Sequence, residues 1–262
     1  MQHSGDLPPG SAVGSRPTRG LRLAYVRAGF RVGGHGSQCR KVTTTTLCVC
    51  SGEGLVIDED EFFDSRYDFD FSDLKDTGTF YRGGEVYRRP CGWLRFALKV
   101  CTCHRQTDRQ TDRQTLAKRM TLQVWDKYPD GNAWLGERGY RTTTTYSVPG
   151  EWPVSYHGTS KNGARAIIVT NYQPGPGQKY GRGVYSTPYL EHAVEYTRTF
   201  QSSVTGKNYR VVMQNRVNPA YRERHNGGVY WLLPVPDGLT QEQEQDLVEK
   251  AIRPYAVLIK PL

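Results

Sequence analysis

Residues 154–188 read VSYHGTSKNGARAIIVTNYQPGPGQKYGRGVYSTP. They predict a strand, a helix and a glycine-rich turn in close succession. An apolar strand ends in the segment YHGTS at 156–160. Over 160–170, Ala164, Ile167 and Ile168 follow the i, i+3, i+4 spacing of an amphipathic helix, and Thr159 and Ser160 before them are of the residue types that cap a helix.

The sequence after this stretch continues the alternation of helix and strand. A second helix is predicted over 188–200, with Thr187 as its N-cap, Pro188 at its first position and an apolar face that includes Leu190 and Ala193. The segments YRVVMQNRV (209–217), VYWLLPV (229–235) and PYAVLIK (254–260) are rich in β-branched and aromatic residues, which is typical of strands. The predicted fold class is α+β.

The chain before residue 152 divides into two parts. Residues 1–60 are rich in Gly, Ser, Thr and Arg without helical or strand periodicity, so we expect a disordered or doubtful N-terminal extension. Residues 61–151 gain regularly spaced aromatics and are predicted to fold and pack on the unit that follows. They contain RQTDRQTDRQT at 105–115, a repeat that a GACA tetranucleotide would encode, and we interpret 101–120 as a low-complexity insertion.

Composition and charge restrict the classes of function. The 262 residues carry a formal charge of +9, which favours an anionic partner, and seven basic residues against one acid precede residue 51. Mean hydropathy is −0.66 and no run approaches the roughly 20 apolar residues of a membrane helix. We therefore expect no membrane association and no secretion.

The cysteine pattern points to a reducing compartment. All six cysteines precede residue 104, and a zinc site can be drawn from the residues Cys48, Cys50, Cys101, Cys103 and His104. The Cys-x-Cys spacing is shorter than that of most structural zinc sites, so free thiols are the preferred interpretation and no metal site is predicted. The expected location is intracellular, cytoplasmic or nuclear.

The order of motifs over about residues 152–262 resembles the catalytic domain of ADP-ribosyltransferases of the poly(ADP-ribose) polymerase type. In that family a His-Gly-(Ser/Thr) strand end is followed by a helix, a variable loop, a Gly-(Lys/Arg)-Gly-(Ile/Val)-Tyr motif and a short helix with a further Tyr. Here 156–159 read YHGT, 181–185 read GRGVY, and Tyr196 lies in the predicted second helix. The resemblance implies an ADP-ribosyltransferase-like split β-sheet with short helices.

The resemblance also implies a binding site for NAD, which the family uses as a substrate. The Gly158 backbone would hold the nicotinamide carboxamide, and His157 and Thr159 would bond the ribose hydroxyls on the adenosine side of NAD. Tyr185 and Tyr196 would stack on the nicotinamide ring. His157 and Tyr185 are the implied catalytic residues.

Basic residues near the glycine-rich motif fit the rest of that ligand. Lys179 and Arg182 are placed where they could meet the pyrophosphate of NAD, because guanidinium and ammonium groups form charge-assisted hydrogen bonds with phosphate oxygens. The alternative for both residues is that each is a solvent-exposed charge on a loop and binds no ligand.

Two positions depart from the family pattern. Ala193 stands where the family has a Ser that bonds the carboxamide, and Val229 stands where it has a Glu that polarises the acceptor hydroxyl. A valine cannot act as a base. Glu223 offers a carboxylate nearby, although a surface loop acid is the commoner interpretation.

Three functions remain open at this stage. The first is mono-ADP-ribosyl transfer from NAD to a protein or nucleic-acid acceptor, with release of nicotinamide. The second is a catalytically silent module that binds NAD or ADP-ribose or mediates an interaction. The third is an RNA 2′-phosphotransferase-like enzyme, since that family shares the fold and a His-Gly-Thr motif but lacks the Gly-x-Gly-(Ile/Val)-Tyr motif.

Overall fold

The structure is a computed structural model of the 262-residue chain. It describes residues 62–76, 78–105, 122–126, 128–136, 143–202 and 205–262. The predicted N-terminal extension 1–60 and most of the predicted insertion 101–120 lie outside these residues. The described chain is mixed α+β, with mostly antiparallel sheets and few helices, which confirms the predicted fold class.

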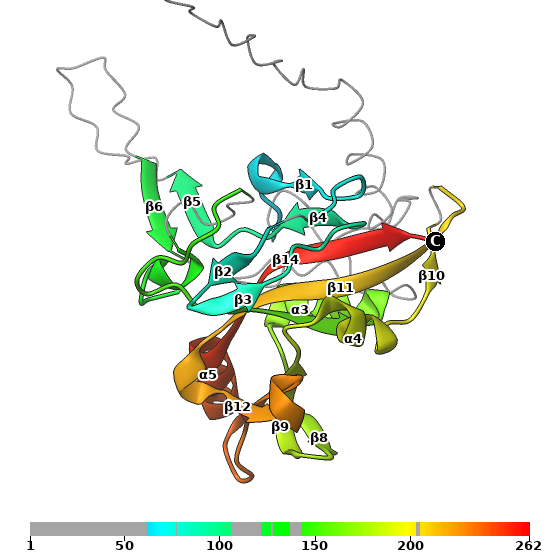
Figure 1. The fold of residues 1–262 in the computed structure, drawn as a ribbon. Coiled ribbons are helices and arrows are strands. Elements are labelled where there is room, and N and C mark those ends of the chain that lie inside the picture. Colours follow the sequence, from blue (N-terminus) through cyan, green and yellow to red (C-terminus); the bar gives the residue numbers. More distant parts are fainter. Residues whose placement is uncertain (1–61, 77, 106–121, 127, 137–142, 203–204) are drawn as a thin grey trace, which may run out of the picture.

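The larger sheet has six strands, all paired antiparallel (Figure 1). Two long strands, β11 and β14, run side by side through it. β4 pairs with the far edge of β14, and β7 pairs with β11. The six strands are β1 (Phe69–Asp70), β4 (Leu94–Ala97), β7 (Val154–Thr159), β10 (Phe200–Gln201), β11 (Asn208–Val217) and β14 (Ile252–Pro261).

The smaller sheet has four strands in the order β12-β13-β9-β8. They are β8 (Gly175–Gln178), β9 (Gly181–Ser186), β12 (Glu223–His225) and β13 (Tyr230–Pro234). Two separate hairpins complete the strands, one from β2 (Phe80–Arg82) and β3 (Glu85–Tyr87), the other from β5 (Cys101–Arg105) and β6 (Leu122–Asp126).

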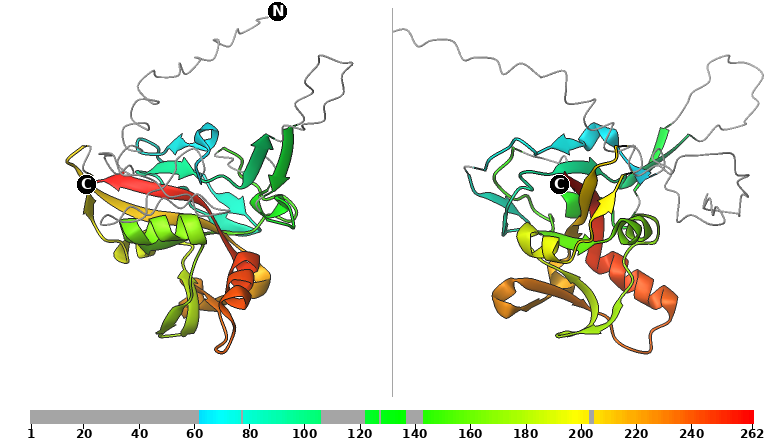
Figure 2. Two further views of the ribbon diagram at one scale, coloured as in Figure 1. Left: turned by 180° about the vertical axis from the view of Figure 1, so that it is seen from behind. Right: turned by 90° about the vertical axis from the view of Figure 1, so that its right-hand side faces the viewer.

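Three α-helices lie against these sheets: α3 (Lys161–Thr170), α4 (Leu190–Glu195) and α5 (Gln241–Ala251). Figure 2 shows α3 along one face of the larger sheet, and α5 beside the smaller one. α4 packs on β7 and β11. Short 3-10 turns connect the other elements: η2 (Ser65–Tyr67), η3 (Ala133–Leu135), η4 (Pro219–Tyr221) and η5 (Asn226–Gly228).

Both faces of the larger sheet are buried. Along β11, Val211 and Met213 pack with α3 and α5 in one apolar cluster, whereas Val212 between them packs with Tyr156 and Trp93 in the other. All are under 5% exposed. Successive side chains of a strand point to opposite faces, so near-continuous apolar runs are expected when both faces are covered. This explains the uninterrupted apolar character of the long strands.

The upstream segment joins the C-terminal part through a buried ion cluster as well as through β4. The Glu151 carboxylate lies 3.0 Å from Arg216 Nη2 and 3.7 Å from Arg82 Nε, and all three side chains are at most 2% exposed. Removing one partner would leave an uncompensated buried charge, which is strongly destabilising. Residues from both sides of position 152 therefore share one sheet and one charge network.

Several sequence predictions are confirmed. α3 begins after Ser160, whose hydroxyl accepts a hydrogen bond from the Gly163 amide at 3.0 Å. The three predicted strands are β11, β13 and β14. The segment around Leu94, within the part of 61–151 that was expected to fold, is the fully buried strand β4.

The prediction of a second helix over 188–200 was wrong in extent. α4 begins only at Leu190, its N-cap is Tyr189, and it ends before Tyr196. Thr187 cannot serve as the cap because its backbone pairs with Tyr156 in a β-bridge. Phe200 belongs to β10, paired with Tyr209.

Three other segments differ from the prediction. The glycine-rich GRGVYS is strand β9 rather than a loop. Residues Cys101–Arg105, assigned to the insertion, form strand β5 and pair with β6. The helix α5 was not predicted, although Thr240 and Gln243 form a capping box at its start.

Candidate active site

The YHGT and GRGVY motifs meet through one hydrogen bond. His157, on β7, has Nδ1 2.7 Å from the carbonyl oxygen of Tyr185 on β9. A carbonyl oxygen only accepts, so Nδ1 carries the proton and Nε2 keeps its lone pair. Burial lowers the pKa of His157 below its ordinary value, although the bond to the Tyr185 carbonyl partly opposes this. The imidazole is therefore a neutral group whose Nε2 can accept a hydrogen bond.

Backbone pairing holds these two motifs in register. Tyr156 and Thr187 exchange two backbone hydrogen bonds of 2.7 and 3.0 Å, which link β7 to the end of β9. The Tyr156 ring is fully buried and its hydroxyl donates to the Arg88 carbonyl at 2.7 Å. The edge of the His157 ring also meets the Tyr172 ring, with centroids 5.1 Å apart. The imidazole is thus held by two contacts, the hydrogen bond to the Tyr185 carbonyl and the Tyr172 ring.

Gly158 lies where β7 and α4 make their closest approach. A Cβ atom at this position would stand 1.8 Å from the carbonyl oxygen of Ala193 and 3.1 Å from Cβ of Tyr196. Both obstacles belong to α4 or its C-cap, and the nearer one is backbone. Only glycine fits, which explains the glycine of the motif as a packing requirement.

Thr159 ends β7 beside the start of α3. A Cβ at Gly163 would lie 2.2 Å from Thr159 Oγ1, so the glycine at this position in the first turn of the helix makes room for the hydroxyl. The Thr159 carbonyl accepts a long backbone hydrogen bond from Arg198. The side chain of Thr159 is half-buried.

Tyr185 is hydrogen-bonded both through its backbone carbonyl and through its side-chain hydroxyl. Its backbone carbonyl receives the His157 bond, and its hydroxyl donates to the Gly181 carbonyl at 2.7 Å and accepts from the Tyr180 amide at 3.1 Å. Such anchoring fixes the plane of a ring that remains half-buried. The orientation of the Tyr185 ring is therefore fixed by hydrogen bonds at its hydroxyl.

Tyr196 is more exposed than Tyr185, since 58% of its surface is accessible to solvent. A hydrogen bond with Tyr230 is the main cause that raises the pKa of Tyr196 to about 12. Tyr230 and His225 lie near Tyr180, whose ring stacks on His225 with centroids 4.3 Å apart and planes at 12°. These three aromatic residues were not predicted from the sequence. Tyr180 directly precedes the GRGVY motif, but its partners depend on the β12–β13 pairing.

Arg182 is engaged with acidic and carbonyl groups of the smaller sheet and α5. Its Nη2 lies 2.5 Å from Glu244, its Nη1 donates to the carbonyls of Val235 and Pro236, and Asp237 lies 3.6 Å from its Nε. Its role as a pyrophosphate ligand stays a prediction. Lys179 lies over the Tyr180 ring at 5.3 Å and is exposed.

The two departures from the family pattern lie within the described chain. Ala193 is 1% exposed and supplies the carbonyl that abuts Gly158, so its backbone rather than its side chain faces β7. Val229 follows the turn η5 and precedes β13. Glu223 lies 3.1 Å from His225 Nε2 and is half exposed.

The described residues contain no cluster of three or more metal-ligating side chains. The residues from which a zinc site could be drawn lie outside this description, Cys48 and Cys50 entirely and Cys101, Cys103 and His104 by their side chains. Among the residues that the structure describes, no helix is both long and apolar enough to cross a membrane. No protein-family model matches this sequence, and a search of curated proteins found no match.

Proposed function

We propose that this protein is an ADP-ribosyltransferase of the poly(ADP-ribose) polymerase type that transfers single ADP-ribose units from NAD to a protein or nucleic-acid acceptor. The observation that carries the proposal is the bond from His157 to the Tyr185 carbonyl. It joins the two sequence motifs of the resemblance at one site and fixes the imidazole tautomer.

The residues at this site suit the chemistry of NAD cleavage. Breaking the glycosidic bond to nicotinamide develops positive charge on the ribose, so the site must orient the ribose and hold the leaving ring. His157 Nε2 accepts from one hydroxyl of the adenosine-side ribose and Thr159 Oγ1 bonds a second, which anchors NAD while its nicotinamide end reacts. The anchored ring of Tyr185 supports one face of nicotinamide, and the exposed Tyr196 closes over the other. Ring pairs of this kind contribute about 0.5–1.5 kcal/mol beyond buried area.

The absence of a carboxylate at position 229 sets the scope of the reaction. Elongation requires a base that activates the 2′-hydroxyl of an ADP-ribose already attached, and such assistance is worth about 100- to 10,000-fold. Orientation of NAD and departure of nicotinamide do not depend on that base. We therefore assign single transfer rather than polymer synthesis.

The second candidate is a module that binds NAD or ADP-ribose without turnover. Two observations favour it. Position 229 is a valine, which cannot activate an acceptor hydroxyl. The Glu223 carboxylate, the closest one to position 229 in the sequence, pairs with the His225 imidazole. Both candidates require the same His157 site and the same two tyrosines.

One experiment separates the two. Purified protein is titrated with NAD in a calorimeter, and the recovered solution is assayed for free nicotinamide. The transferase binds NAD and releases nicotinamide, and the His157→Ala protein releases none. Binding with no nicotinamide release would favour the silent module, and no heat of binding at millimolar NAD would remove both. Nicotinamide release that requires an added 2′-phosphorylated RNA would favour the RNA 2′-phosphotransferase-like enzyme.

A further inference from the structure

A cavity beside α4 shares none of its lining residues with the proposed NAD site. It has a volume of about 720 Å³ and is lined by the 76–93 segment, by α4, and by the ends of β11 and β14. Leu190 and Val194 of α4 face it, whereas Ala193 faces Gly158. This volume falls within the range of about 300–1,000 Å³ that is typical of small-molecule sites.

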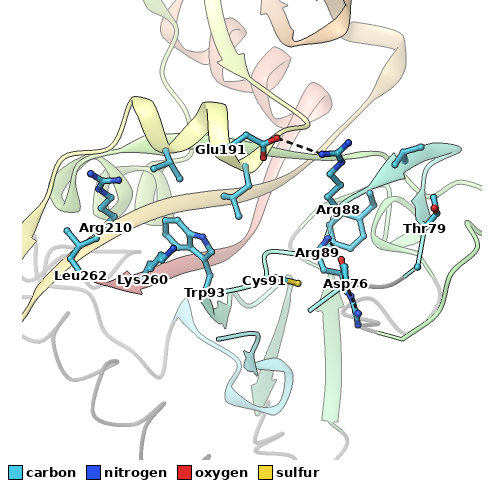
Figure 3. A pocket seen from close by; sticks show the side chains of 15 residues that line it. Asp76, Thr79, Arg88, Arg89, Cys91, Trp93, Glu191, Arg210, Lys260 and Leu262 are labelled. Carbon is cyan, nitrogen blue, oxygen red and sulfur yellow. Dashed lines mark hydrogen bonds and ion pairs between the residues drawn. The ribbon is translucent and has the colours of Figure 1, made fainter. Parts of the chain in front are cut away.

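Figure 3 shows how the charged residues divide between the ends of this cavity. Arg88, Arg89 and Asp76 lie toward one end, and Arg210 and Lys260 lie toward the other, with Trp93 and Cys91 between them. At the first end the cations are matched, because Arg89 pairs with Asp76 and Arg88 lies 3.9 Å from Glu191. The surplus positive charge is therefore at the second end.

Arg210 and Lys260 form an unusual pair. They stand directly opposite each other in the β11–β14 ladder, where like charges destabilise a sheet. Within the described part of the chain, neither side chain has a carboxylate within ion-pair distance. The Arg210 Nε atom is buried and has no hydrogen-bond partner among the described residues. A ligand in the cavity would meet the Nη1 and Nη2 atoms of Arg210, because the enclosed Nε atom cannot be reached from the cavity.

Apolar groups form the remaining wall. Trp93, Leu190 and Val194 line the cavity beside the cationic pair, and Lys260 Nζ lies 5.9 Å from the centre of the Trp93 ring. A ligand that fits both features has an anionic group at one end and an apolar or planar body.

We propose that this cavity binds a phosphomonoester of about mononucleotide size, with its phosphate between Arg210 and Lys260 and its body along Trp93 and Leu190. A phosphate carries nearly two negative charges and three strong acceptor oxygens, which balance the two cations better than a single carboxylate does. The site is separate from the His157 site and does not depend on the proposed reaction.

The test is calorimetric titration of the whole protein with uridine 5′-monophosphate, uridine and inorganic phosphate. All titrations use the His157→Ala background, which removes one ligand contact at the proposed NAD site, and the cavity variants below assign the remaining binding to the cavity. The nucleotide is expected to bind with a Kd below about 1 mM. Uridine and inorganic phosphate alone are each expected to bind at least about tenfold more weakly, because uridine lacks the phosphate group and inorganic phosphate lacks the planar body.

Substitutions at the cationic end provide the second arm. Lys260→Gln and Arg210→Gln should each weaken nucleotide binding at least about tenfold without lowering the thermal midpoint of the free protein, since each removes like-charge repulsion. The matched control is Lys250→Gln on α5, which leaves the cavity unchanged. The proposal is overturned if the nucleotide does not bind, if Lys260→Gln binds it as well as the control does, or if inorganic phosphate binds equally tightly, which would mean an adventitious ion only.

Discussion

The substitution Gly158→Ala tests how closely β7 and α4 must approach for the site to form. The added Cβ would stand 1.8 Å from the Ala193 carbonyl oxygen, against an ordinary carbon–oxygen contact of about 3.3 Å. The strand and helix must therefore separate by about 1.5 Å. The obstacle is backbone, so no rotamer change relieves it, and we place the cost at the upper end of overpacking, about 3 kcal/mol. For a folded region of this size, that lowers the thermal midpoint by about 6–12 °C.

The same displacement moves Tyr196, which caps α4. Nicotinamide affinity should then fall at least about tenfold. Thermal unfolding by circular dichroism and nicotinamide titration measure the two effects. Gly78→Ala is the matched control, because nothing lies within 4 Å of its added Cβ, and its stability should change by less than about 0.5 kcal/mol. A Gly158→Ala protein with the midpoint and nicotinamide affinity of wild type would refute this reasoning.

Three further predictions follow from the site and its surroundings. Tyr185→Ala and Tyr196→Ala should each weaken NAD or nicotinamide binding by about 1 kcal/mol or more, and unchanged affinity in both would remove their stacking role. Replacing residues 106–121, which connect the paired strands β5 and β6, by a two-residue Asn-Gly turn should change the unfolding free energy by less than about 1 kcal/mol; a larger loss in a denaturant titration would mean that the segment contributes to folding. Burial lowers the pKa of His157 in the folded protein, so its contribution to stability is complete above the unfolded value of about 6.5 and is lost as the pH falls below it. Denaturant unfolding between pH 8 and 5 should show this dependence in wild type and less of it in His157→Gln; equal pH profiles would contradict it.

The elements that the sequence predicted correctly are those whose pattern is local. α3 has a serine cap and apolar residues at helical spacing, and β11 and β14 have long runs of β-branched residues. The boundary of α4 could not be read in the same way. Thr187 has the chemistry of an N-cap, yet its backbone is committed to pairing with Tyr156, a contact 31 positions distant in the sequence.

Glycine-rich β9 shows why a strand can be read as a loop. Gly183 has a φ of +154° and a Cβ there would lie 2.0 Å from the Leu233 carbonyl oxygen. A glycine is needed at this position because β9 approaches β13 closely. In the sequence alone, the same glycine indicates a turn. α5 was missed for the opposite reason, because its first six residues are all Gln, Glu or Asp and only Val248 and Ala251 are buried.

The candidate site was predictable in its motifs and not in its aromatic surroundings. The resemblance of the YHGT and GRGVY segments to the family motifs implied roles for His157 and Tyr185, and in the structure the His157 ring is hydrogen-bonded to the Tyr185 carbonyl. Tyr180, His225 and Tyr230 gather only because β12 and β13 pair antiparallel with β9 alongside. The register of such long-range pairing is set by tertiary packing, which a single sequence does not specify.

The central claim is that this chain transfers single ADP-ribose units from NAD. Mass spectrometry of proteolytic peptides after incubation with NAD and a cell extract that supplies acceptors measures this directly, because it resolves the number of ADP-ribose units at each modified position. We predict mass increments of one ADP-ribose per modified position and free nicotinamide in equal amount, both absent in His157→Ala, with NAD turnover raised in Val229→Glu because that substitution supplies the missing carboxylate. Ladders of successive ADP-ribose additions from the natural sequence, or increments that persist in His157→Ala, would contradict the account.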